Sequence, residues 1–351
     1  MDVSDAPHYK ASTSLSAYNH DRRLSKSSWS AVSRCAACLS HGISPFVSVR
    51  SFSYSRCDEC GFVFANPRPT DEHLNAFYNS AFYDNYRTCE RERIKATPYF
   101  SISTSSIPMI AEWIAQDRDA ALLDFGCGPG SFLAYLRDRH GFTNLTGLEL
   151  NRSSVEVARQ SYGLNILSDP AALEGRRFDI VVLIEVIEHI SDPDEVMQAV
   201  DHLLQPGGRL IVTTDAVDNP VAKRFPAWSP HFTGPSHISL FSTDALTRLL
   251  SRFGYDIERR EVIHVQELLG NALAGPFYRL DFSSPASRDD VQDMLFVPTE
   301  FGRRLGLRPT RRLPRPLRAL KRVDGMAARA IERFSGRKFP WHQFVVARKV
   351  G

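Results

Sequence analysis

The sequence predicts an α/β protein whose main domain is a doubly wound, mostly parallel sheet. Short apolar runs alternate along the chain with amphipathic helical stretches, and this alternation is typical of βαβ units. A glycine-rich turn follows the first run, and two CxxC pairs precede the whole pattern. The predicted strands lie at 120–126, 144–150, 165–169, 179–186, 208–214, 255–263 and 343–350.

Length and composition restrict the class of protein. The chain has 351 residues, more than one domain usually holds, so smaller units are expected beside the main domain. With 43% hydrophobic and 24% charged residues it is an ordinary globular chain, which excludes a disordered or fibrous protein. No signal-peptide pattern is found, and the longest apolar run, Ile180–Ile184, is far shorter than the roughly 20 residues of a transmembrane helix. A soluble cytoplasmic protein is expected.

Four of the six cysteines form two close pairs near the N-terminus. Cys35 and Cys38 are separated by eighteen residues from Cys57 and Cys60, which is the two-knuckle spacing of a tetrahedral zinc site. Four thiolates would fill the coordination sphere and leave no position for water, so the metal is expected to be structural. The alternative is four free thiols.

The glycine-rich turn lies between an apolar strand and an amphipathic helix. Gly126, Gly128 and Gly130 allow a tight turn and a close approach of the backbone to a ligand. Glu149 follows Gly130 by nineteen positions, close to the roughly 20-residue offset at which an acidic side chain meets ribose hydroxyls. Ser131 stands where the dinucleotide fingerprint has its third glycine, which favours a nucleoside without pyrophosphate.

Four motifs in order resemble those of the class I S-adenosylmethionine-dependent methyltransferases. They are Leu123–Gly130 (LDFGCGPG), Phe178–Val181 (FDIV), Glu185–Ile190 (EVIEHI) and Leu204–Leu210 (LQPGGRL). The resemblance covers roughly residues 70–262 and implies a Rossmann-like, seven-stranded sheet whose last strand is antiparallel. It also implies S-adenosylmethionine as cofactor, bound by Asp124 and the three glycines, by Glu149 at the ribose and by Asp169 near the adenine.

Two histidines are candidates for removing a proton from the methyl acceptor. Histidine has an unperturbed pKa of about 6.5, which suits a general base near neutrality. His189 follows the fourth strand at the carboxyl edge of the sheet, and the resemblance favours His237 in the loop after the fifth. The alternative is that each histidine only holds a loop by hydrogen bonds. Glu185 and Glu188 are expected to fix a neighbouring loop or face the cationic cofactor rather than act as an acid/base pair.

Outside the main domain the chain is expected to carry smaller segments. The second half of the region before the last strand, Arg303–Lys338, is rich in arginine and has an amphipathic pattern. It is either a solvated helix face or a contact for an anionic partner, such as a phosphorylated or nucleotide-linked acceptor, a carrier protein or a membrane surface. The predicted segments are a disordered tail at 1–33, the zinc-binding module at 34–69, a helical segment packing on the catalytic domain at 70–117, the cofactor-binding domain at 118–263, a basic helical insertion that could act as a lid at 264–340, and the final strand at 341–351.

The expected activity is methyl transfer to a small molecule, at oxygen, with sugars, lipid-linked compounds and secondary metabolites as acceptor classes. The first alternative is a nucleic-acid methyltransferase. The segment Ile184–Ile187 lacks the Asn/Asp-Pro-Pro-aromatic element of enzymes that methylate base amino groups, which argues against that alternative. The second is a non-catalytic protein that binds the cofactor, since fold alone does not establish activity.

Overall fold

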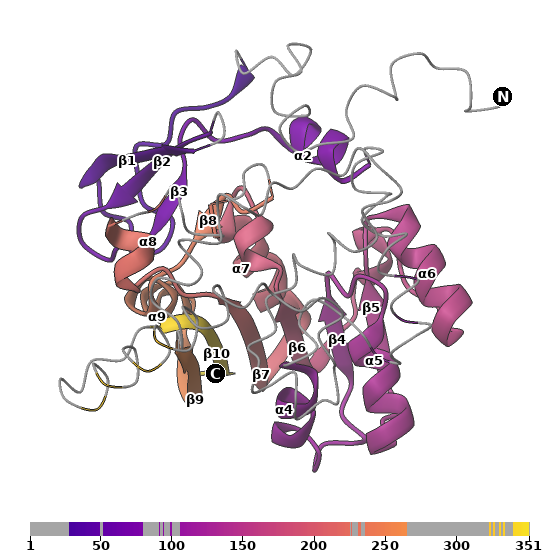
Figure 1. Cartoon of the computed structure of the whole chain (residues 1–351). Coiled ribbons are helices and arrows are strands. Elements are labelled where there is room, and N and C mark those ends of the chain that lie inside the picture. Colours follow the sequence, from indigo (N-terminus) through magenta and orange to yellow (C-terminus); the bar gives the residue numbers. More distant parts are fainter. Residues whose placement is uncertain are drawn as a thin grey trace, which may run out of the picture.

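The computed structural model describes residues 28–49, 52–79, 106–224, 236–264 and 340–350, with isolated positions between them. The main sheet has six strands in the order β5-β4-β6-β7-β10-β9 (Figure 1). Their bounds are β4 Leu122–Phe125, β5 Leu145–Leu148, β6 Phe178–Ile184, β7 Leu204–Asp215, β9 Tyr255–His264 and β10 Pro340–Lys349. β5, β4, β6 and β7 are parallel, whereas β10 is antiparallel to both β7 and β9. The antiparallel last strand is thus confirmed.

Helices cover both faces of this sheet because successive strand residues point to opposite sides. Leu122 and Ile180 face one core, whereas Leu123 and Val181 face the other. The first core is covered by α4 (Ser106–Trp113), α5 (Ser131–Tyr135) with its continuation η4 (Leu136–His140), and α6 (Arg152–Tyr162). The second is covered by α7 (Pro193–Leu203) and α9 (Thr243–Arg252). The doubly wound architecture follows from this alternation.

The seventh strand that we expected at 165–169 is not confirmed. In the described residues this stretch contributes a single parallel bridge, between Leu148 and Leu167. The Asp169 side chain accepts a hydrogen bond from the Ala171 backbone N–H at 2.9 Å, and Pro170 starts the short helix η5 (Pro170–Leu173). Because the chain turns into a capped helix there, pairing along β5 cannot continue.

A second, smaller sheet has the antiparallel order β1-β2-β3-β8. Its strands are β1 Ile43–Val49, β2 Phe52–Cys57, β3 Val63–Ala65 and β8 Ser239–Leu240. The first three belong to the predicted zinc module, but β8 lies between β7 and β9 of the main domain in the sequence. The module therefore shares its sheet with the domain that it precedes.

One boundary of the predicted segments changes. Residues 28–33 do not belong to a disordered tail, because Trp29 is buried against Phe52 and His73 and Ser30 bridges Arg68. Composition alone predicted a disordered tail because it gave no sign that Trp29 is buried. The rest of the predicted tail, 1–27, lies outside the described residues.

Other expectations fall partly or wholly outside the described residues. In the segment 70–117 the structure describes α2 (Asp71–Tyr78), with Leu74 and Phe77 buried, and α4. The basic insertion and its lid role lie outside, apart from a few isolated positions. Within the described ranges no helix is both long and apolar enough to cross a bilayer. The remaining helices are α8 (Pro220–Arg224) and η6 (Ile187–His189).

Candidate active site and four-cysteine cluster

The glycine-rich turn follows β4 and adopts backbone angles that favour glycine. Gly126, Gly128 and Gly130 all have positive φ, at 79°, 53° and 75°. A Cβ added to Gly126 would lie 2.7 Å from a methyl carbon of Val186, and one on Gly130 would lie 2.6 Å from Leu164. The turn is therefore close-packed as well as left-handed, and the three glycines stand together as the sequence predicted.

Glu149 stabilises this turn from the end of β5. One carboxylate oxygen accepts a hydrogen bond from the Gly128 backbone N–H at 2.9 Å, and the other accepts one from Asn151 at 2.7 Å. Each carboxylate oxygen has a second lone pair, so the half-buried group can also accept from a ligand hydroxyl. Glu149, which is predicted to bind the ribose, is thus hydrogen-bonded to the predicted glycine turn.

Two predicted cofactor-binding aspartates have different surroundings. Asp124 is buried in β4, and burial together with the charge of Glu149 raises its pKa to about 8. Asp169 is exposed and caps η5 through the Ala171 N–H. That contact is the ordinary structural role of an aspartate at a helix start.

Asp215, at the carboxyl end of β7, is surrounded by three histidines. Its Oδ2 lies 2.8 Å from His231 Nδ1 and 3.3 Å from His237 Nδ1, and its Oδ1 lies 3.5 Å from His342 Nδ1. Burial raises the pKa of Asp215, but the charge and hydrogen bonds of these histidines hold it well below its usual range. Asp215 is therefore an anion.

His237 and His189 lie side by side, with ring centroids 4.9 Å apart. Burial lowers the pKa of His237, yet the nearby carboxylate of Asp215, with the charges of Glu188 and Glu185, raises it overall. His189 instead approaches a backbone carbonyl, with Nδ1 2.8 Å from Ser236 O. Burial and the neighbouring His237 lower the pKa of His189 to about 4. The two predicted histidines are thus brought together but differ in basicity.

The two glutamates of the fourth motif are part of the same cluster. Glu185 has a φ of 54°, a rare conformation for a residue with a side chain, and its Oε1 lies 2.7 Å from His342 Nε2. Burial lowers the pKa of His342, but Glu185 and Asp215 raise it to about 10, so this histidine is a cation. Glu188 is fully buried and accepts a hydrogen bond from the Thr214 hydroxyl at 2.9 Å. Burial and the charge of Glu185 raise its pKa to about 8.

Sequence reasoning missed Asp215 and His342 as members of this site. Asp215 ends an apolar strand without a recognisable motif, and His342 begins a strand at the far end of the chain. The only available signal was position, because β7 ends at the edge where doubly wound sheets bind ligands. The antiparallel pairing of His342 with Asp215 in adjacent strands requires the folded sheet.

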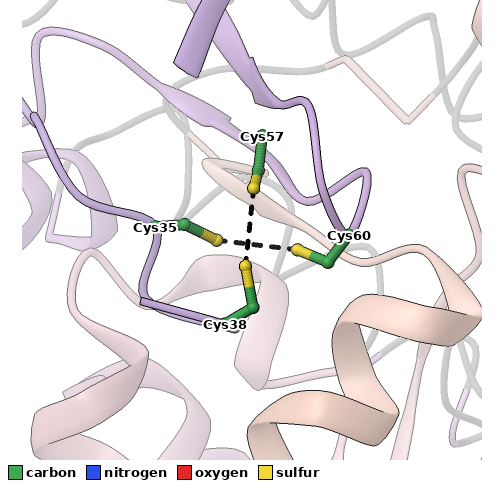
Figure 2. Close-up of side chains that lie close together, drawn as sticks. All are labelled: Cys35, Cys38, Cys57 and Cys60. Carbon is green, nitrogen blue, oxygen red and sulfur yellow. Dashed lines mark hydrogen bonds between the residues drawn. The ribbon is translucent and has the colours of Figure 1, made fainter. Parts of the chain in front are cut away.

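The four predicted metal-ligating cysteines converge from two loops, as Figure 2 shows. The Sγ atoms of Cys35 and Cys60 are 3.6 Å apart and those of Cys38 and Cys57 are 3.5 Å apart. All four lie within 4.8 Å of one another and none is in a disulfide. A zinc ion with Zn–S bonds of about 2.3 Å holds its sulfurs about 3.8 Å apart at the corners of a tetrahedron. The arrangement of the thiols fits such an ion.

Comparison with known proteins finds a family model that matches the main domain. Residues 105–259 match the family described as methyltransferase domain. We call the matched residues 105–259 the methyltransferase domain. It contains β4 to α9 and hence the glycine turn, Glu149, Asp215 and both candidate histidines.

Curated relatives match the chain over part of their own length. A ubiquinone biosynthesis O-methyltransferase of Serratia proteamaculans is 31% identical over 129 residues, which is 34% of this chain and 50% of the relative. One from Xylella fastidiosa is 35% identical over 104 residues, covering 27% and 42%. The chain thus spans about half the length of the curated relatives that it matches.

Solved structures resemble the chain at low identity. A coclaurine N-methyltransferase bound to N-methylheliamine and SAH has a TM-score of 0.42 and 15% identity, covering 70% of this chain and 72% of its own. Magnesium protoporphyrin IX methyltransferase from Synechocystis with bound SAH has a TM-score of 0.42 and 18% identity, covering 56% and 94%.

Proposed function

We propose that the protein is an S-adenosylmethionine-dependent methyltransferase that methylates a small-molecule acceptor at oxygen. The observation that carries the proposal is the pair His237 and Asp215, 3.3 Å apart at the carboxyl edge of the sheet that holds the glycine turn. An oxygen acceptor must lose a proton during transfer, and a histidine oriented by a buried carboxylate is suited to take it. The matching methyltransferase domain supports the reaction type.

The cofactor would be held by the glycine turn and Glu149. Gly126 and Gly128 let the backbone approach the methionine part closely, and Glu149 has free acceptor capacity for the ribose hydroxyls. When bound, S-adenosylmethionine supplies a methyl group that its sulfonium already makes electrophilic. The protein's main contribution is then to align the acceptor, an effect worth roughly 7–11 kcal/mol in well-oriented reactions.

Of the two candidate bases we favour His237. Its raised pKa makes it the stronger base, and Asp215 stabilises the positive charge that it gains with the proton. His189, with a pKa of about 4, is neutral near pH 7 but a weaker base. Its Nδ1 faces the Ser236 carbonyl, which leaves Nε2 to accept a hydrogen bond from the acceptor. His189 is thus assigned to orient the acceptor.

The names of the relatives guide the choice of acceptor. Both are called ubiquinone biosynthesis O-methyltransferases, which favours lipid-linked compounds with a ring hydroxyl among the acceptor classes considered above. The matches cover half of these relatives or less, so their names alone do not give the exact acceptor of this chain. Sugars and secondary metabolites remain in the panel to be tested.

The cysteine cluster is proposed to bind a structural zinc ion. The four thiols support this through their number, their near-tetrahedral separations and the burial of Cys35, Cys57 and Cys60. With four protein ligands no position is left for substrate or water, so the ion would stabilise the module and take no part in methyl transfer.

The test is methyl transfer from isotopically labelled S-adenosylmethionine to matched acceptor pairs. Each pair consists of a phenolic, sugar or lipid-linked compound with a free hydroxyl and the same compound with that hydroxyl already methylated. We expect label in the free member alone, and a loss of kcat of roughly 10²- to 10⁴-fold in His237→Ala with unchanged cofactor affinity. Label in RNA or DNA, or cofactor binding without transfer to any acceptor, would contradict the proposal.

A further inference from the structure

We infer that the cysteine module is a structural part of the acceptor site, because it holds the segment that carries His237, with Tyr54 as a positioning residue. This inference rests on the proposed role of His237. It gives the module a role in catalysis. Neither the four cysteines nor the family match of residues 105–259 implies such a role.

The backbone after His237 is held between the two parts of the protein. The Ile238 N–H donates to the Glu188 carbonyl at 2.9 Å, which fixes it to the methyltransferase domain. The Ile238 carbonyl accepts from the Ala65 N–H of the module at 2.8 Å. The module also contacts the next residue of this segment, because β3 pairs with β8 and Phe64 lies opposite Ser239. Neither partner alone satisfies both backbone groups of Ile238 in this way.

Tyr54 makes the contact nearest to the histidine. Its hydroxyl donates to the His237 carbonyl at 2.9 Å, across 183 positions of sequence. Tyr54 is 2% exposed in β2 and lies three residues before Cys57. A buried tyrosine hydroxyl needs a partner, and here the partner is the backbone of the proposed base. The hydroxyl thus fixes the peptide from which the imidazole projects.

The cysteine cluster itself rests on the segment that follows β8. The Ser242 hydroxyl donates to the Cys60 carbonyl at 2.5 Å, and the Phe62 ring lies 4.7 Å from Phe241. Cys35, Cys57 and Cys60 belong to the same buried cluster as Leu246 and Leu249 of α9. A disturbance of the four thiols is therefore transmitted through Phe62 and β3 to the segment 237–242.

The cofactor side does not depend on these contacts. The glycine turn is fixed by Glu149 of the methyltransferase domain and by packing against Val186 and Leu164. Loss of the module's hold should accordingly impair methyl transfer while S-adenosylmethionine still binds. Such a separation distinguishes positioning of His237 from a general loss of folding.

Tyr54→Phe tests the inference, with Tyr255→Phe as the matched control. Tyr255 is also a strand tyrosine with 1% exposure, and its hydroxyl donates to Asp201 at 3.2 Å, a residue outside the histidine cluster. Both changes remove one buried hydroxyl bond. We expect Tyr54→Phe to lower kcat by roughly 2- to 10-fold, the equivalent of one hydrogen bond. The affinity for S-adenosylmethionine should stay unchanged, and Tyr255→Phe should leave kcat unchanged.

Amide hydrogen exchange of the full-length protein provides a readout that needs no acceptor. In Tyr54→Phe, and in wild type whose thiol-bound metal has been removed by a chelator, the amides of 238–242 should exchange faster while those of 126–130 do not. Equal kcat in the two tyrosine variants, or unchanged exchange at 238–242, would overturn the inference. If the wild type transfers no methyl group, the proposed function fails, whereas the exchange result still decides whether the module holds this segment.

Discussion

At the scale of single residues, the local environment gives different pKa values to side chains of the same type. His189 and His237 are neighbours, but only His237 faces the Asp215 carboxylate. This difference in pKa is the reason why we propose His237 for proton removal and His189 for orientation of the acceptor. Methyl transfer by this site should therefore depend on pH through His237.

The pH profile of kcat/KM tests that assignment. A base must be neutral to act, and the pKa of His237 is raised above the usual 6.5, so activity should fall as the pH drops through that raised value. Asp215→Asn removes the charge that raises it, so the acid limb should move to lower pH and kcat should fall. His202→Gln, an exposed histidine on α7, should keep the wild-type profile. An acid limb that stays in place in Asp215→Asn would exclude His237 as the titrating base.

The glycine turn gives a second residue-scale prediction. Gly126 and Gly141 both have positive φ, at 79° and 73°, but only Gly126 is packed against Val186. Alanine at either position costs about 1–2 kcal/mol of backbone strain, and at Gly126 a further 1–3 kcal/mol of overpacking. Gly126→Ala should therefore unfold at lower denaturant than Gly141→Ala and bind S-adenosylmethionine more weakly. Equal stability and cofactor affinity in the two variants would show that the turn has room to relax.

At the scale of elements, the small sheet depends on residues distant in sequence. β1, β2 and β3 form an antiparallel meander with few residues, and its core is completed by aromatic side chains from outside these strands, such as Trp29 and Phe232. A short sheet of this size is marginal by itself in water. Metal at the four thiols would supply the missing stability.

Removal of that metal is the corresponding prediction. Wild type should contain one zinc ion per chain, and prolonged chelation should lower its melting temperature. Cys57→Ser should lose the ion and melt earlier, whereas Cys127→Ala, outside the cluster, should retain it. Elemental analysis and a thermal melt measure both quantities. A metal-free wild type that melts as before would leave the thiols without the proposed ion.

At the scale of the whole molecule, the module and the methyltransferase domain form one folding unit. β8 pairs with β3, and Arg68 forms an ion pair with Asp192 at 2.5 Å. The buried side chains of Leu240 and Phe241 are covered in part by the module. Domains that share a core in this way do not move as independent units connected by a flexible linker.

Truncation tests this unity. Deletion of residues 1–69 would expose the edge of β8 and the apolar surface around Phe241, so the remaining chain should aggregate or melt at a lower temperature. A stable, monomeric chain starting at residue 70 would show instead that the module is an independent appendage.

The sequence by itself determined the doubly wound domain, the glycine turn with Glu149 and the four cysteines. These features are readable because each depends on local periodicity or on a fixed spacing that the chemistry of a turn or a metal site requires. Backbone pairing decided the strand count, since the capped turn at Asp169 ended the expected third strand after a single bridge. Only the tertiary structure brought Asp215 and His342 to the candidate histidines and Tyr54 to the backbone of His237. Contacts between strands far apart in the chain carry no periodic signal, because they depend on which edges and faces meet once the apolar surfaces are buried.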